Sequence, residues 1–137
     1  MRNTFTIKKE KKQLKFSRMT TSSRVTRNLG LLRIKTGLTP NIFLRFAFCM
    51  SLKDPSIPNP DEHNQEGSEL APAVLFGEHE PIYMALMLNR LKKDKLDPEI
   101  YLQKMTRAHL NRGAISLWPR IHQLSDFYEL VKEEQNV

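Results

Sequence analysis

The sequence predicts an all-α protein: a single compact domain of about five helices with a flexible basic arm at its N-terminus. Three observations support this prediction. Apolar residues recur three or four positions apart in five separate segments, which is the spacing of an amphipathic helix. Ser, Thr and Asp stand where these segments begin, and Gly or Pro stands where most of them end. Alternation of apolar and polar residues, the pattern of a strand, is confined to a few residues near the N-terminus.

The composition also bounds what the chain can be. Its 137 residues, 39% hydrophobic and 27% charged, are enough for one domain with an apolar core. The single cysteine, Cys49, excludes a disulfide within the chain and zinc sites built on paired cysteines. The longest apolar run, residues 42–52, is shorter than the roughly 20 residues that span a bilayer. We therefore expect a cytoplasmic protein with no membrane segment.

Residues 1–19 form the predicted arm, and residues 20–137 form the helical domain. Residues 8–12 hold four lysines and one glutamate without an apolar stripe, which is typical of a solvated tail. Phe5 and Ile7 alternate with polar residues and indicate a short strand. A second interpretation stays open, in which the native protein starts at Met19.

The first helix begins after the Thr and Ser residues at 20–23, whose hydroxyl groups accept hydrogen bonds from a first turn. Val25, Leu29 and Leu32 form its apolar stripe. Gly37 is expected to end the helix, because glycine adopts the left-handed conformation common at helix C-termini.

The second helix is predicted from Thr39-Pro40 to about residue 52. Thr39 is the cap, Pro40 takes the first helical position, and Pro55 stops the helix. Between residues 42 and 50 only Arg45 is charged. A helix that is apolar on every side must be surrounded by protein, so we expect it at the centre of the fold or in a subunit interface.

An acidic, proline-rich loop at residues 53–72 separates these helices from the rest. The third helix is predicted from about residue 80 to 93, with Ile82, Ala85, Leu86 and Asn89 on one side. Further apolar residues widen this stripe: Tyr83, Met84, Met87, Leu88 and Leu91. Residues 78–80, Glu-His-Glu, are expected to cap its N-terminus.

Two further helices complete the prediction. One starts at Asp97-Pro98, buries Ile100 among other residues, and ends at Gly113. The last follows a break at residue 119, and its stripe is predicted to be Ile121, Leu124, Tyr128 and Val131.

Charge is distributed very unevenly along the chain. Residues 1–50 contain twelve Lys and Arg and one acid, a net charge of +11, whereas residues 51–137 carry a net charge of −4. A surface that serves only solubility mixes both signs. A segment with this much unbalanced positive charge indicates a polyanionic partner, either nucleic acid or an anionic membrane surface, and nucleic acid is the one that we favour.

Signals for catalysis are weak. The Glu-His-Glu triplet at 78–80 resembles acid–base or metal-ligand chemistry, but a second ligand at helical spacing does not follow it. His63, His109 and His122 have no partners at ligand spacing. Cys49 lies on an apolar helix face, where a buried thiol is inert. We therefore predict no catalytic residue, no metal site and no cofactor.

Three stretches resemble the DndE family, small proteins of bacterial DNA sulfur modification (phosphorothioation) systems. The first runs from residue 35 to 42, Lys-Thr-Gly-Leu-Thr-Pro-Asn-Ile, and continues through Arg45, Ala47, Cys49, Ser51 and Leu52. The second is Leu-Phe-Gly-Glu-His at residues 75–79, and the third, weaker one is the Arg112-Gly113 region. The resemblance covers roughly residues 20–125, so the basic arm lies outside it.

The resemblance implies a helical protein that forms a homo-oligomer, a tetramer, and binds duplex DNA, preferably nicked, through Lys and Arg. It implies work beside a cysteine desulfurase, an iron–sulfur protein and an ATPase that together replace a non-bridging phosphate oxygen with sulfur. We place the subunit interface at Gly37, Phe43, Phe46 and Phe48.

The predicted function is that of a non-enzymatic DNA-binding accessory subunit that contacts phosphates rather than bases. The cations assigned to phosphate contact are four on the first helix and four in the arm: Arg24, Arg27, Arg33, Lys35, Lys8, Lys9, Lys11 and Lys12. Two alternatives remain open. One is a dimeric helix-turn-helix or ribbon-helix-helix repressor that reads bases with a strand at residues 5–8. The other is a nicking nuclease or a sulfur carrier that uses Cys49.

Overall fold

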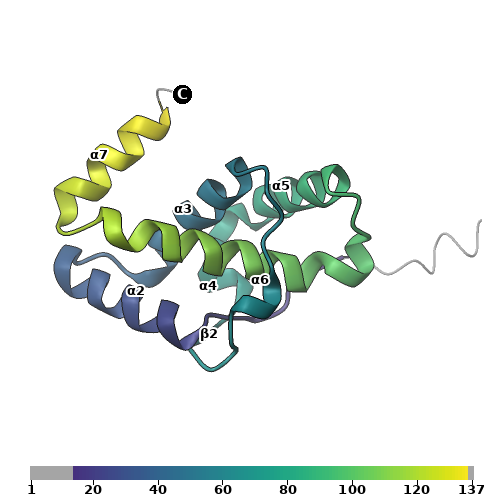
Figure 1. Ribbon diagram of the computed structural model, residues 1–137, viewed down its shortest axis with the longest axis horizontal. Coiled ribbons are helices and arrows are strands. Elements are labelled where there is room, and N and C mark those ends of the chain that lie inside the picture. Colours follow the sequence, from purple (N-terminus) through teal and green to yellow (C-terminus); the bar gives the residue numbers. More distant parts are fainter. Residues whose placement is uncertain (1–13, 136–137) are drawn as a thin grey trace, which may run out of the picture.

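The computed structural model describes residues 14–135 and confirms the all-α prediction. Two helices form its centre: α3 (Pro40–Lys53) packs along α6 (Pro98–Leu117) over most of its length. The other helices surround this pair, and the last one projects from one end of an elongated body (Figure 1). The core is apolar and includes Phe43, Phe48 and Phe76, none of which is exposed.

Helix α2 (Ser23–Thr36) has the boundaries that its sequence predicts. The hydroxyl oxygen of Ser22 accepts a hydrogen bond from the N–H of Val25 at 3.1 Å, which satisfies one donor of the first turn. Gly37 has a φ of 82° and donates its N–H to the carbonyl of Arg33. This left-handed conformation carries little cost only for glycine. Val25, Leu29 and Leu32 are buried as expected.

Helix α3 begins at Pro40 and ends at Lys53, one residue past the predicted end. Its position explains its composition. Because α6, α4 (Pro72–Phe76) and the rest of the core surround it, α3 has no fully solvated face, and the prediction of a central helix is confirmed. The residue before Pro55 adopts an extended conformation, with a ψ of 121° at Asp54, and this stops the helix.

The segment before α2 belongs in part to the domain. Phe16 and Met19 are 6% and 1% exposed and lie in the core. Residues Met19–Thr20 form strand β1, which pairs antiparallel with β2 (Glu69–Leu70) in a two-stranded sheet. The predicted arm at 1–19 therefore ends earlier than expected, because two apolar side chains at 16 and 19 anchor the described part of it to the core.

The loop after α3 contains one short 3₁₀ helix, η1 (Pro60–Glu62), before it reaches β2. In Figure 1 this loop crosses over α6, and η1 contacts that helix. The crossing places residues 58–65 beside the middle of α6, more than thirty positions away in sequence.

The chain then forms α4, the 3₁₀ helix η2 (Gly77–His79) and α5 (Glu80–Lys93). Two expectations for α5 are only partly right. Its buried residues include Met87 and Leu91, whereas Ile82 is 57% exposed and Leu86 is 41% exposed, because the helix is apolar on more than one side. His79, at the N-cap position, forms no side-chain capping hydrogen bond.

Helix α6 continues through Gly113 to Leu117, so the predicted end at Gly113 is wrong. Glycine is needed there for another reason. A Cβ atom at residue 113 would lie 2.0 Å from the carbonyl oxygen of Ala47. Gly113 thus lets the backbones of α3 and α6 approach closely. At the other end of α6, Ile100 is 64% exposed rather than buried.

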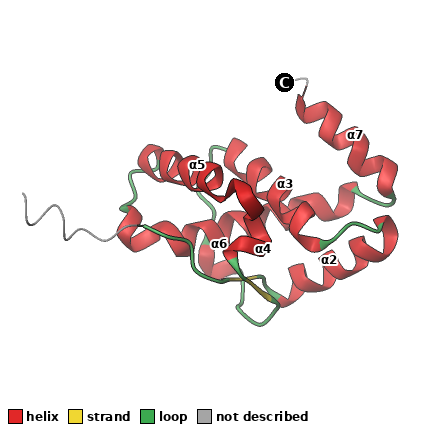
Figure 2. Ribbon diagram, turned by 180° about the vertical axis from the view of Figure 1, so that it is seen from behind, coloured by secondary structure: helices red, strands yellow, loops and turns green. Residues whose placement is uncertain are grey.

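The 3₁₀ helix η3 (Trp118–Arg120) leads to α7 (Leu124–Gln135), the helix that projects from the body in Figures 1 and 2. The predicted stripe is only partly right. Ile121 is buried before the helix begins, but Leu124 is 49% and Tyr128 is 62% exposed. Helix α7 instead packs through Phe127, whose ring centroid lies 4.9 Å from that of Phe43. Phe127 faces the body because α3 offers aromatic partners there.

Candidate nucleic-acid interface

The four cations predicted on α2 all reach the surface. Arg24, Arg27, Arg33 and Lys35 are exposed, and no carboxylate of residues 14–135 lies within 4.0 Å of any of them. Their charges are therefore not neutralised by ion pairs within the described domain. Exposed, unpaired cations on one helix are suited to an external anion.

The helix separates these cations into two groups. At about 100° per residue, Arg24, Arg27 and Lys35 fall within about 80° of one another, whereas Arg33 lies about 180° from Arg24. The first group thus forms one basic face, and Arg33 lies on the opposite flank. Ile34, which is 81% exposed, lies only about 20° from Arg27 at this spacing, so apolar and basic residues share the outer side of α2.

Two members of the basic face have further neighbours. The ammonium group of Lys35 lies 4.6 Å from the centroid of the Trp118 ring, a cation–π contact that holds it beside η3. Arg24 lines a cavity of about 300 Å³ together with His63 and Arg112. Burial and the neighbouring Arg107 lower the pKa of His63, so its imidazole is neutral at neutral pH.

The basic residues of the arm, Lys8, Lys9, Lys11 and Lys12, lie outside the described residues, as does the strand expected at residues 5–8. Their assignment to phosphate contact stays a prediction.

Sequence reasoning missed three cations that the fold gathers around a second cavity, next to η1. Arg18, Lys104 and Arg107 line this cavity of about 320 Å³. They are missed because they come from the segment before β1 and from α6, so no local pattern connects them. The only available signal is a pair of basic residues three positions apart, 104 and 107, which lie on one side of a helix.

The three stretches that resemble the DndE family converge on α3. Arg45 donates through Nε to the carbonyl of Leu75 at 2.7 Å and through Nη2 to that of Val74 at 3.2 Å. A Cβ atom at Gly77, whose φ is 62°, would lie 2.9 Å from Nη2 of Arg45. The first stretch thus binds the second, and these residues hold α4 against α3.

The third stretch also meets the first. Arg112 donates through Nε to the hydroxyl of Ser51 at 2.9 Å and through Nη2 to the Ser51 carbonyl at 2.8 Å. It further binds Ser56 and lies 3.8 Å from a carboxylate oxygen of Asp54. Its neighbour Gly113 packs on the backbone of α3. The motif residues therefore assemble the fold and form no reactive cluster.

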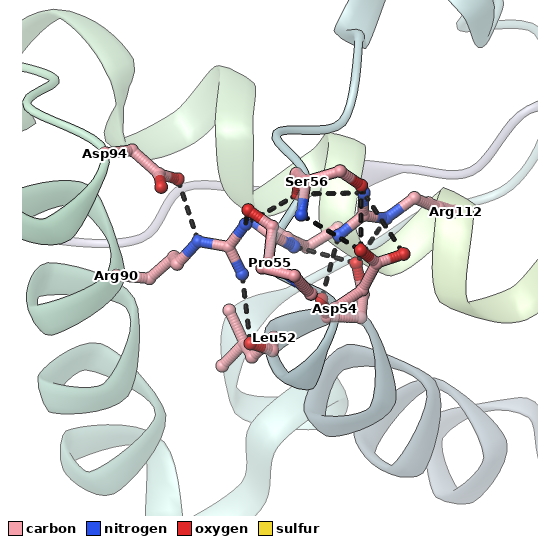
Figure 3. A network of polar contacts seen from close by, with 9 residues as sticks. Leu52, Asp54, Pro55, Ser56, Arg90, Asp94 and Arg112 are labelled. Carbon is pink, nitrogen blue, oxygen red and sulfur yellow. Dashed lines mark hydrogen bonds and ion pairs between the residues drawn. The ribbon is translucent and has the colours of Figure 1, made fainter.

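A second arginine completes this polar network (Figure 3). Arg90 donates to the carbonyls of Leu52, Pro55 and Ser56, and its Nε lies 2.8 Å from a carboxylate oxygen of Asp94. Arg90 is only 5% exposed. The network fixes the end of α3 and the start of the loop to α5 and α6, which sets the path of residues 58–65.

His109 lies beneath the network and is fully buried. Its Nδ1 atom is 2.8 Å from the hydroxyl oxygen of Ser51, and its Nε2 atom has no hydrogen-bond partner among the described residues. Burial, helped by the charges of Arg90 and Arg112, lowers the pKa of His109 to about 3. The ring is therefore neutral in the folded protein and serves packing, with its edge toward Phe48.

The residues considered for other chemistry give no reactive arrangement. Among residues 14–135, no group of three or more His, Cys, Asp or Glu side chains could hold a metal ion. Cys49 is half-buried, and burial raises the pKa of its thiol, which disfavours the nucleophilic thiolate. In the described part of the chain, no helix is both long and apolar enough to cross a membrane.

The residues assigned to a subunit interface have different surroundings. Phe43 and Phe48 are 0% exposed, because rings of the same chain cover them, and their side chains cannot contact another subunit in this conformation. Phe46 is half-buried, 5.3 Å from Phe127 between ring centroids, and Gly37 is exposed. Gly37 and Phe46 thus remain the members of this set with accessible surface.

Comparison with known proteins gives one family and several similar solved structures, two of which are described below. The model of the family "DNA sulphur modification protein DndE" matches residues 18–123. A crystal structure of DndE from Escherichia coli B7A, a protein involved in DNA phosphorothioation modification, has 26% sequence identity and a TM-score of 0.59. That match covers 74% of this chain and 95% of the other.

A second crystal structure, a glycine-to-lysine mutant of DndE, has 24% identity and a TM-score of 0.57, and covers 74% of this chain and 96% of the other. At this identity it supports the fold alone. No curated protein matches the chain by sequence.

Proposed function

Because this chain belongs to the DndE family of DNA sulphur modification proteins, we propose that it is a DNA-binding accessory subunit of a DNA phosphorothioation system. In this role the protein binds the phosphate backbone of duplex DNA, preferably at a nick, and carries out no chemistry itself. The single observation that carries the proposal is the face formed by Arg24, Arg27 and Lys35 on α2, whose charges have no carboxylate partner in the described domain.

The size of this face supports contact with DNA. Arg24 and Lys35 are eleven residues apart, which is about 16 Å along a helix at 1.5 Å per residue. That length equals the axial rise of about five nucleotides, at 3.4 Å per nucleotide of one strand. Lys and Arg that contact phosphates position a protein on DNA without reading its sequence. A nick fits such a mode because it lowers the cost of bending the duplex.

The proposal includes assembly as a homo-oligomer, a tetramer. Its support is exposed apolar area on α2, where Leu31 is 40% and Ile34 is 81% exposed on the side of the helix that also carries Arg27. Together with Gly37 and the half-buried Phe46, these residues offer apolar area that a second copy of the chain would bury. An oligomer would also repeat the cations that its interface leaves exposed and so multiply the phosphate contacts.

The family membership further supports work beside the other components of such a system: a cysteine desulfurase, an iron–sulfur protein and an ATPase. Among these components, the present chain is the one that binds DNA. The described residues contribute no reactive cluster that would compete with this role, and the thiol of Cys49 is partly buried.

The experiment that tests the proposal compares two triple variants. Replacing Arg24, Arg27 and Lys35 with alanine should weaken binding to a nicked duplex. The negative slope of log K against log salt concentration should become shallower by about 2 to 3, since each lost phosphate contact reduces its magnitude by about 0.9. The control replaces Lys92, Lys93 and Lys132, three exposed cations on α5 and α7, and removes the same charge. Equal slopes for both variants would refute a specific role for α2.

A further inference from the structure

Arg107 is buried without a counterion among the described residues. It is 8% exposed, and its Nη2 atom donates to the carbonyls of His63, at 3.0 Å, and Asn64. Within residues 14–135, its buried Nε atom has no hydrogen-bond partner, and no carboxylate lies within 4.0 Å of the guanidinium. Burial lowers the pKa of Arg107, but an arginine does not lose its proton in a protein. The charge therefore remains.

The other arginines of the interior differ in this respect. Arg90, which is 5% exposed, lies 2.8 Å from Asp94. Arg112 lies 3.8 Å from Asp54. Both also have hydrogen bonds to several backbone carbonyls. Because an uncompensated buried charge is strongly unfavourable, the described fold leaves Arg107 short of one negative charge that an external anion would supply.

The space for that anion is the cavity of about 320 Å³ next to η1. Arg107 lines it, and Arg18 and Lys104 lie on exposed parts of its wall. Thr20 adds a hydroxyl group to the lining. The cavity also contains Asp61, so its ionisable lining carries three positive charges and one negative charge.

We propose that this cavity binds a single phosphate group, with Arg107 as its inner cation and Arg18 and Lys104 at its rim. Guanidinium and ammonium groups form strong charge-assisted hydrogen bonds to phosphate oxygens. Arg18 is divided between this role and an ion pair with Glu69 at 3.3 Å. Asp61 weakens the binding of any anion, which makes it a useful position for a test.

Two sources of phosphate share this chemistry: a free phosphate ion, and the terminal phosphate of a DNA strand at a nick. A recessed cavity suits a strand end better than a continuous backbone, which lies along a surface. The DNA source rests on the proposed function, whereas the affinity for free phosphate does not.

The first experiment uses inorganic phosphate and the full chain. Calorimetric titration with sodium phosphate, against sodium chloride at equal ionic strength, should show saturable binding. Lys104→Gln should weaken it roughly 5- to 10-fold, the effect of one partly exposed charged hydrogen bond. Asp61→Asn should strengthen it roughly 2- to 5-fold by removing a like charge. Lys92→Gln, a change of an exposed lysine outside the cavity, should leave it unchanged.

Arg107→Gln changes a buried residue and need not fold. The variants above change exposed side chains, so they test the cavity in a folded protein. Where Arg107→Gln does fold, it should abolish phosphate binding. The proposal is overturned if phosphate binds no better than chloride, or if Lys104→Gln and Lys92→Gln have the same effect.

The second experiment compares nicked duplexes that end in a 5′-phosphate or a 5′-hydroxyl group. If the cavity takes a strand end, the phosphorylated nick should bind several-fold more tightly, and Lys104→Gln should remove the difference. Binding of free phosphate without binding of DNA would refute the proposed function but not the cavity. Equal binding of both nicks, with no binding of free phosphate, would refute the cavity but leave the proposed function intact.

Discussion

The contact between Gly113 and Ala47 gives the sharpest prediction for the fold. In Gly113→Ala the new Cβ atom would lie 2.0 Å from the carbonyl oxygen of Ala47 and 2.5 Å from its carbonyl carbon. Those atoms belong to the backbone of α3, so no side-chain rotation relieves the overlap. Helices α3 and α6 would have to move apart, and they form the centre of the core.

The magnitude follows from two opposing effects. Overpacking of a core costs about 1–3 kcal/mol, and the upper part of that range applies here because the overlap is with backbone. Alanine in place of glycine within a helix stabilises the helix by about 1 kcal/mol. We therefore expect a net loss of about 1–2 kcal/mol and, for a domain of this size, a Tm lower by about 4–8 °C.

Urea and thermal unfolding followed by circular dichroism measure this change, and Gly30→Ala is the matched control. Gly30 lies in α2 and is exposed, and a Cβ atom added there would meet no other atom within 4 Å. The same substitution should therefore stabilise the protein by about 0.5–1 kcal/mol. A Gly113→Ala protein as stable as the wild type would refute the close helix contact.

Three other changes test further parts of the structure. Arg45→Met should destabilise the protein by about 1–3 kcal/mol in urea unfolding, because the carbonyls of Leu75 and Val74 lose their donor. The control Arg33→Met changes an exposed residue of α2 and should have almost no effect on stability. The folded pKa of His109, about 3, lies below its unfolded value of 6.5, so the unfolded chain takes up the proton first and stability falls as the pH drops below about 6.5. This group should make the free energy of unfolding about 1–2 kcal/mol lower at pH 5 than at pH 7.5. His109→Gln should reduce that difference. Cys49→Ser should leave the phosphorothioate content of DNA in cells unchanged, as mass spectrometry would show, whereas loss of the modification would favour a sulfur carrier.

Local signals in the sequence predict the helix boundaries well. The hydroxyl of Ser22, the proline at residue 40 and the cap at Asp97 act within one turn, so the chain around them carries all the needed information. Gly113 shows the limit of such signals. Glycine ends helices and also permits close packing, and only the position of Ala47, far away in sequence, decides between the two.

Helix faces and the cation cavity are harder to predict for related reasons. Helix α5 is apolar on more than one side, and the single apolar stripe of α7 is wide, so periodicity does not choose between Leu86 and Met87, or between Tyr128 and Phe127. The aromatic partner on α3 makes the choice for Phe127. Arg18 and Arg107 meet at one cavity only because the loop after α3 crosses α6.

The basic face of α2 is easier to predict than the cation cavity but harder than the helix boundaries. Its residues could be predicted because they are close in sequence and carry one sign of charge. Helical geometry then removes Arg33 from the group, since it points to the opposite flank from Arg24. The lack of carboxylate partners in the described domain depends on the tertiary structure.

The salt dependence of DNA binding tests the proposed function most directly. Fluorescence anisotropy of the wild-type protein with two nicked duplexes of unrelated sequence should give nearly equal affinities, and log K should fall linearly with log salt concentration with a slope of about −3 or steeper. Failure to bind either duplex at low salt, or strong preference for one sequence with little salt dependence, would contradict recognition of the phosphate backbone.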